Sequence, residues 1–261
     1  MVLTIDIGNT NVVVGCMDQD SIYFIERVST DNKKTALEYA MILKTVFDLK
    51  NIKQDMIEGG IISSVVPPLT HVMIEAVEKV LGKTPMLVGP GIKTGLNIQM
   101  DNPNTVGSDL VVDAVAGVHE YGAPLIIVDL GTATTISVVD KNKNYIGGMI
   151  IPGMRVSMEA LASGAAQLQR VSFEVPKKVI GTNTIDCMRS GLVLGSASCI
   201  DGLIDRIYAE LGYEPKIVAT GGLAKIIVPI CKHDIILDDA LLLKGLYLIY
   251  KRNEKEGKKG C

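Results

Sequence analysis

The stretch Asp6-Ile7-Gly8-Asn9-Thr10-Asn11 decides the fold, because a near copy of it recurs downstream as Asp129-Leu130-Gly131-Thr132-Ala133-Thr134. A short apolar run precedes each copy, and an apolar run rich in β-branched residues follows it. Both stretches therefore predict the same unit: a strand, a tight turn that begins near an Asp, and a second strand. Two such turns facing one another would clamp a chain of phosphate groups, so the repeat indicates a nucleotide-dependent enzyme.

Around each copy, the sequence predicts a meander of three antiparallel strands followed by alternating helices and strands. In the first half we expect strands at 2–5, 12–17, 22–28, 60–66 and 86–88, and helices at 35–48 and 69–81. In the second half we expect strands at 125–128, 134–139, 145–151 and 216–219, and helices at 154–163, 185–211, 223–230 and 239–250. This repeated order is typical of a duplicated ribonuclease-H-like (actin-like ATPase) α/β fold with a mixed sheet in each lobe.

The two turns define two lobes. We expect a first lobe at 1–117 that carries the first turn, and a second lobe at 118–252 that carries the second turn and a glycine pair further on. A helix at about 105–120 is expected to bridge them. The charged, Gly-rich residues 253–261 are expected to form a frayed tail.

The composition is that of a globular protein, since 48% of the 261 residues are hydrophobic and 21% are charged. A net charge of −3 provides no basic field, so we expect neither nucleic acid nor a membrane surface as a main partner. No uncharged apolar stretch approaches the roughly 18–20 residues of a membrane span. The five cysteines lack the spacing of a zinc site or a disulfide framework. We expect a cytoplasmic protein in which Cys16 and Cys199 are small core residues.

The first turn has the chemistry of a phosphate site. Gly8 allows the backbone to turn tightly against a ligand, and the residues Asn9, Thr10 and Asn11 offer short side chains and successive N–H groups. Asp6 is placed to hold Mg²⁺, usually through water. A plain hairpin turn is the alternative. The second copy, at the equivalent place in the repeat, favours phosphate binding.

The second turn offers Asp129 and the hydroxyl groups of Thr132 and Thr134, which can reach phosphate oxygens. Further on, Gly221 and Gly222 lie where a strand ends and a helix begins. Small residues there allow an adenine ring and a ribose to lie against the backbone, although a plain turn has the same pattern.

Asp109, within Gly107-Ser108-Asp109, is the candidate catalytic residue. A carboxylate at the start of the bridging helix can accept a proton from a substrate hydroxyl as that hydroxyl attacks the γ-phosphate. The alternative is a helix cap or an acid favoured by the helix dipole. Asp113, one turn later, is expected at the surface or in a lobe contact.

Taken in order, these motifs resemble those of type III pantothenate kinases, of the acetate and sugar kinase, Hsp70 and actin superfamily. The motifs are Asp6 to Asn11, Gly107-Ser108-Asp109, Asp129 to Thr134, Gly147-Gly148 with Ile151-Pro152-Gly153, Asn183-Thr184 and Gly221-Gly222. The resemblance implies phosphorylation of pantothenate by ATP to give 4′-phosphopantothenate, the first step of coenzyme A synthesis. It also implies a homodimer.

The resemblance further implies a role for each matching residue. Asp6, Ile7, Gly8, Asn9, Thr10, Asn11, Val12 and Val13 would hold the ATP phosphates and Mg²⁺, and Thr132 would contact ATP. Asp109 would be the general base, and Asp129 would bind a monovalent cation, K⁺ or NH₄⁺. Gly107, Ser108, Asp109 and Leu110 would form the pantothenate site, which Thr184 would close, from the partner subunit in a dimer.

Two residues depart from the family pattern. Leu110 stands where the family usually has an Arg that contacts the pantothenate carboxylate, and Met100 stands where many members have Tyr. Loss of a charge-assisted contact would weaken pantothenate binding by about 1–3 kcal/mol. Two other hypotheses therefore remain beside a pantothenate kinase: a related kinase of this fold with a different hydroxylated substrate, and a non-catalytic ATP-binding regulator.

Overall fold

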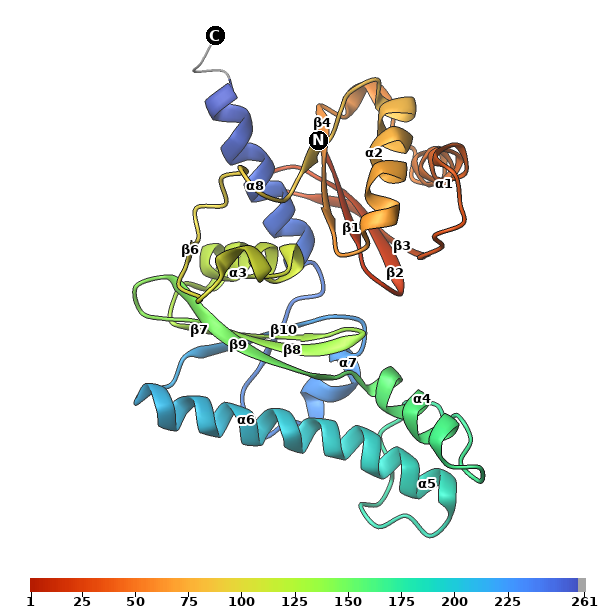
Figure 1. The fold of residues 1–261 in the computed structure, drawn as a ribbon, viewed down its shortest axis with the longest axis vertical. Coiled ribbons are helices and arrows are strands. Elements are labelled where there is room, and N and C mark those ends of the chain that lie inside the picture. The colour runs from red at the N-terminus through yellow and green to blue at the C-terminus, as the bar shows by residue number, and fades with distance from the viewer. Residues whose placement is uncertain (258–261) are drawn as a thin grey trace. The chain divides into compact units, whose positions relative to one another are not determined.

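The computed structural model describes residues 1–257, and the chain forms two compact units. The first unit contains Met1–Leu96, Asp101–His119 and residues 240–257. The second unit contains Asn97–Met100 and Glu120–Asp239. Figure 1 shows the elements of both units, which are described separately below.

The first unit is built on a five-stranded mixed sheet in the order β3-β2-β1-β4-β5. Its strands are β1 (Val2–Ile7), β2 (Asn11–Met17), β3 (Ile22–Ser29), β4 (Gly59–Ser64) and β5 (Met86–Leu87). The strand β1 pairs antiparallel with β2 and parallel with β4. The expected meander with an added parallel strand is therefore confirmed for this unit.

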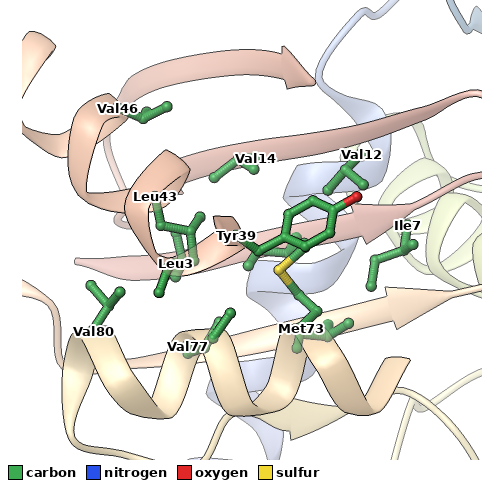
Figure 2. Packing of buried hydrophobic residues seen from close by; sticks show 14 of the residues in the cluster. Leu3, Ile7, Val12, Val14, Tyr39, Leu43, Val46, Met73, Val77 and Val80 are labelled. Carbon is green, nitrogen blue, oxygen red and sulfur yellow. The ribbon is translucent and has the colours of Figure 1, made fainter. Parts of the chain in front are cut away.

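Helices α1 (Ala36–Leu49) and α2 (Pro67–Leu81) pack on one face of this sheet (Figures 1 and 2). Successive side chains of a strand point to opposite faces, so Leu3, Ile5 and Ile7 of β1 share this face. Figure 2 shows Tyr39 and Leu43 of α1 and Met73 and Val77 of α2 on the side of the sheet that carries Leu3 and Ile7. This cluster is the main core of the unit.

The opposite face of the same sheet carries the alternate residues of β1 and β4, among them Val2 and Ile61. It is covered by α3 (Ser108–Tyr121) and α8 (Leu241–Gly257), which contribute Val112, Leu246 and Ile249 to a second buried cluster. The two helices cross closely, because a Cβ at Gly245 would overlap the backbone of Val112.

The second unit repeats the plan. Its sheet has the order β11-β10-β7-β8-β9-β6, so the series β9-β8-β7-β10-β11 corresponds to β3-β2-β1-β4-β5. The strands are β6 (Asn97–Ile98), β7 (Leu125–Leu130), β8 (Ala133–Val139), β9 (Asn144–Pro152), β10 (Lys216–Thr220) and β11 (Ile236–Leu237). The strand β7 again pairs antiparallel with its successor and parallel with the crossover strand β10. The duplication read from the sequence is confirmed.

The helices of the second unit are α4 (Met154–Gly164), α5 (Thr184–Arg189), a π-helical turn (Ser190–Leu194), α6 (Gly195–Leu211) and α7 (Ala224–Ile227). Short 3-10 helices occur in the chain at Gln54–Met56, Pro103–Thr105 and Val228–Ile230. Within the described part of the chain, one continuous helical stretch, Thr184–Leu211, is long and apolar enough to cross a membrane by length and composition alone. Its side chains Val193, Ile200 and Ile204 pack in the core of the second unit, as in the core helix of a globular domain.

Several expectations differ from the structure. The helix α8 packs with the first unit rather than with residues 118–239, and it continues to Gly257, so residues 253–257 are helical rather than frayed. The expected tail beyond them, 258–261, lies outside the described residues. Cys16 is buried as expected, but Cys199 is exposed, because it lies beside the buried stripe of α6. Asp113 is buried, so the first of its two expected positions, at the surface, is wrong.

Candidate active site

The first turn joins β1 to β2 and is held by hydrogen bonds. The Gly8 amide donates to the Asn11 carbonyl over 3.0 Å, and the Thr30 hydroxyl donates to the Gly8 carbonyl over 2.6 Å. A Cβ at Gly8 would lie 3.1 Å from the Asn11 carbonyl oxygen, so the tightness of the turn favours glycine. Asn9, Thr10 and Asn11 are exposed. The turn is thus a fixed backbone loop whose polar side chains reach solvent.

Asp6 lies one residue before the end of β1 and is only 9% exposed. Because strand residues alternate between faces, its side chain lies on the face that α3 and α8 cover, not on the face of α1 and α2. In the parallel pair with β4, Asp6 is in register with Ser63. Paired residues of neighbouring strands share a face, so Asp6 and Ser63 lie side by side.

Ser63 connects this strand end to α3. Its side chain is fully buried, and its hydroxyl oxygen lies 3.0 Å from the hydroxyl oxygen of Ser108, the first residue of α3. The Ser108 hydroxyl also lies 3.3 Å from the backbone carbonyl oxygen of Ser64 and can donate to it. The beginning of α3 is therefore attached to the carboxyl end of β4, beside the carboxyl end of β1.

Asp109 follows Ser108 in the first turn of α3. Its Oδ1 accepts a hydrogen bond from the Leu110 amide over 2.9 Å and lies against Gly107, where a Cβ would overlap it. Burial raises the pKa of Asp109 above the ordinary value, and the hydrogen bond from Leu110 partly opposes that shift. A carboxylate with a raised pKa is a stronger proton acceptor, as a general base requires.

In the second unit, Asp129 lies one residue before the end of β7, as Asp6 does in β1, and it is in register with Thr220 of β10. The residue after Thr220 is Gly221, whose φ of +95° favours glycine. A Cβ at Gly221 would overlap Asp129 Oδ1 and the backbone of Leu130. The second turn and the glycine pair thus lie together, as the sequence indicated.

Two further glycines of the motif series lie in contact with this turn and its strand. A Cβ at Gly148 would overlap the carbonyl oxygen of Ile136 in β8, and a Cβ at Gly153 would overlap the carbonyl oxygen of Thr132. Gly148 therefore lets β9 approach β8 closely, and Gly153 lets the start of α4 approach the second turn.

The structure sorts the predicted residues into groups. Within the first unit it brings Asp6 and the first turn to the same end of the sheet as Gly107, Ser108, Asp109 and Leu110. Within the second unit it brings together Asp129, Thr132, Gly221 and Gly222. Thr184 is exposed at the first position of α5, after the cap residue Asn183. The sequence reasoning missed Ser63, although a hydroxyl near the end of an apolar strand was a signal for it.

The residues of the first turn fit a hard cation. They offer carboxylate, amide and hydroxyl oxygen atoms, which are the donors that Mg²⁺ prefers. Among residues 1–257, no three or more His, Cys, Asp or Glu side chains form a cluster that could bind a metal ion by itself. This is compatible with Mg²⁺, which is commonly held by one or two carboxylates together with water and substrate phosphates.

Comparison with known proteins adds independent information. The family model of type III pantothenate kinase matches residues 2–206. A type III pantothenate kinase of Halalkalibacterium halodurans is 47% identical over 253 residues, which cover 97% of this chain and 100% of the relative. One from Exiguobacterium sp. is 46% identical over 255 residues, which cover 98% of this chain and 100% of the relative.

Among solved structures, an activator of the 2-hydroxyisocaproyl-CoA dehydratase from Clostridium difficile, with bound ADPNP, superimposes with a TM-score of 0.58. It is 13% identical, and the match covers 100% of this chain and 97% of that chain, so it shows a shared actin-like ATPase fold and nothing more. The two sequence relatives are far more similar in sequence, and the matches cover 97% and 98% of this chain and 100% of each relative. The chain belongs to the type III pantothenate kinase family.

Proposed function

We propose that the chain transfers the γ-phosphoryl group of ATP to pantothenate and forms 4′-phosphopantothenate, the first step of coenzyme A biosynthesis. Family membership favours this function over the two other hypotheses. The observation that carries it is the attachment of Asp109 to the Asp6 strand end through Ser63 and Ser108. The candidate phosphate turn and the beginning of α3, which carries the candidate base, thus lie at the same end of one sheet.

In the proposed reaction, Asp109 accepts the proton of the primary hydroxyl of pantothenate. The hydroxyl oxygen attacks the γ-phosphorus in line, a new P–O bond forms, and the bond to the bridging oxygen of ADP breaks. Because phosphoryl transfer needs little covalent chemistry from the protein, catalysis depends on positioning and charge. The N–H groups and side chains of residues 6–13 hold the phosphates.

The cofactors of the proposal are assigned by donor chemistry. Asp6 would hold Mg²⁺ through water, and the ion, when bound, would neutralise charge on the phosphate oxygens. Asp129 would bind K⁺ or NH₄⁺. Thr132 would contact ATP, and the backbone at the half-buried Gly221 and the exposed Gly222 would accept the adenosine. Gly221 already lies against Asp129, which supports a shared role in nucleotide binding.

Pantothenate would contact Gly107 to Leu110, and Leu110 brings no cation for its carboxylate. We propose that Thr184 of a second subunit closes the site in a homodimer. The support is a group of exposed apolar side chains in the second unit, on and between β9 and α5: Ile150, Val156, Leu161, Val175, Val179, Ile180 and Ile185. Such an exposed set is typical of an interaction surface. A cytoplasmic location fits an enzyme whose substrates are ATP and a small metabolite.

Pantothenate-dependent release of ADP by the purified protein, with ATP, Mg²⁺ and K⁺, tests the function. Mass spectrometry should identify 4′-phosphopantothenate. Asp109→Asn should lower kcat by about 10²–10⁴-fold, as loss of a general base does. Asp101→Asn is the matched control. Asp101 is exposed at the beginning of the segment Asp101–His119, which also contains Asp109, and its variant should retain full activity.

Three results would contradict different parts of the proposal. Absence of pantothenate-dependent ADP release by the wild-type protein would refute the substrate. Full activity of Asp109→Asn would refute the base. A protein that is monomeric in sedimentation experiments and fully active in the assay would refute the proposed contribution of a partner's Thr184.

A further inference from the structure

We infer that Ser63 is a positioning residue of the kinase reaction: its buried hydroxyl, through Ser108, fixes the orientation of Asp109 relative to the Asp6 strand end. The inference rests on the proposed function, because it assumes that Asp109 is the base. Ser63 itself is enclosed in the protein, so its effect on catalysis would be indirect.

The contacts define one continuous connection between the two carboxylates. Asp6 and Ser63 are register partners in adjacent parallel strands. Ser63 Oγ and Ser108 Oγ are 3.0 Å apart, and Ser108 precedes Asp109 directly in the first turn of α3. A shift of Ser108 therefore moves the Asp109 backbone relative to the phosphate turn.

The Ser108 hydroxyl has two partners at the end of β4: the Ser63 hydroxyl at 3.0 Å, where either oxygen can be the donor, and the Ser64 carbonyl oxygen at 3.3 Å, which accepts from it. Two contacts from one hydroxyl restrict both the position and the rotation of the first helical turn. The Ser63 side chain is fully buried. Burial of a hydroxyl group costs free energy unless the hydroxyl forms hydrogen bonds. Alanine at residue 63 would fill nearly the same space, so packing alone does not account for the hydroxyl.

The orientation of Asp109 depends on this turn because its carboxylate has little freedom. Its Oδ1 is held by the Leu110 amide at 2.9 Å and lies over Gly107. The carboxylate therefore follows the backbone of residues 107–110 as one piece. Small displacements of a reacting group, of the order of 1 Å, lower rates by up to about a hundredfold.

The experiment compares Ser63→Ala, Ser108→Ala, the double variant and Asp109→Asn in steady-state kinetics of the full-length protein. We expect Ser63→Ala to lower kcat by about ten- to a hundredfold, with the KM for ATP changed less than about twofold. Because the two hydroxyls act as one unit, the double variant should be no slower than the slower single variant. Ser108→Thr keeps a hydroxyl and should recover most of the lost kcat.

Thr70→Ala is the matched control. Thr70 is a half-buried hydroxyl in α2 that donates to Ser64 Oγ and to the Val66 carbonyl oxygen at 2.8 and 3.2 Å. Its removal should lower the melting temperature but leave kcat unchanged. If Ser63→Ala fails to fold, Ser108→Ala and Ser108→Thr still test the inference, because Ser108 is only half-buried.

The possible outcomes separate this inference from the proposed function. Wild-type kcat in Ser63→Ala, with Asp109→Asn inactive, would overturn the positioning role and leave the base intact. Multiplicative losses in the double variant, or a raised KM for ATP with unchanged kcat, would also overturn it. Activity retained in Asp109→Asn would instead refute the base itself.

Discussion

At the scale of single residues, the placement of Asp109 combines two environments. It lies in the first turn of a helix, where the dipole favours a negative charge, and it is partly withdrawn from water, which disfavours that charge. Burial is the larger influence and raises its pKa. The residue therefore retains basicity that a solvent-exposed carboxylate in the same turn would lose.

This balance predicts the acid side of the pH profile. Asp109 must be ionised to accept a proton, so kcat/KM should fall as the pH drops through its raised pKa. The fall is expected at a pH above 3.8, the ordinary pKa of an Asp side chain. Initial rates from pH 4 upward, with ATP and Mg²⁺ saturating, measure it. An activity that stays constant down to pH 4 would contradict the prediction.

The raised pKa of Asp109, which favours its action as a base, lowers the stability of the folded protein at neutral pH. A group whose folded-state pKa is raised binds its proton more tightly in the folded protein, so its contribution to stability is lost as the pH rises through that pKa. Asp109→Asn should therefore be at least as stable as wild type at neutral pH, while it is far less active. A residue that lowers stability and raises activity is expected at a catalytic position.

At the scale of elements, strands with a clear apolar run could be predicted from the sequence, and the details of their edges could not. The six-residue strands β1 and β7 have buried, β-branched residues on both faces and stand out plainly. The two-residue strands β6 and β11 depend on pairing with neighbours that are distant in sequence. The role of Ser63 could not be predicted for a similar reason, because its hydrogen-bond partner Ser108 is 45 residues away in the sequence.

The beginning of α1 provides a prediction about stability. Thr35 accepts a hydrogen bond from the Glu38 amide over 3.4 Å, and the Glu38 carboxylate accepts one from the Thr35 amide over 2.7 Å. Thr35→Ala removes this capping box and should lower the free energy of unfolding by about 1 kcal/mol. Urea denaturation followed by circular dichroism measures the change.

Thr45→Ala is its control, because Thr45 is exposed in the interior of the same helix. Alanine has the higher helix propensity, so this variant should be unchanged or slightly more stable. Equal losses in the two variants would show that the cap contributes nothing beyond an ordinary helix position.

At the scale of the whole molecule, the sequence predicted two similar units but placed the last helix in the second lobe, whereas this helix packs with the first unit. The apolar residues of α8 recur at helical spacing. This spacing predicts that one face of the helix packs against a sheet, but it does not identify the sheet. In the structure, Gly15, Gly59 and Gly245 leave room for α8 or for its contact with α3. These glycines are distributed over the first unit, and the sequence alone did not connect them.

The placement of α8 predicts a large effect of its core residues on the first unit. Leu246 is fully buried against the sheet face that carries Val2 and Ile61. Leu246→Ala should lower the free energy of unfolding by about 2–5 kcal/mol. Leu248→Ala, a half-buried leucine on the same helix, should cost clearly less. Chemical denaturation of both variants tests this, and equal losses would contradict the packing described for α8.

The assignment of α8 to the first unit also determines when that unit can be completed during synthesis. The second unit is encoded mainly by Glu120–Asp239, so it can fold before translation ends. The first unit needs the residues from Ala240 onward to cover one face of its sheet, the face that bears Asp6 and Ser63. The helix that covers this face therefore leaves the ribosome after the second unit, so the unit that carries Asp6 and Asp109 cannot be completed before the second unit has been synthesised.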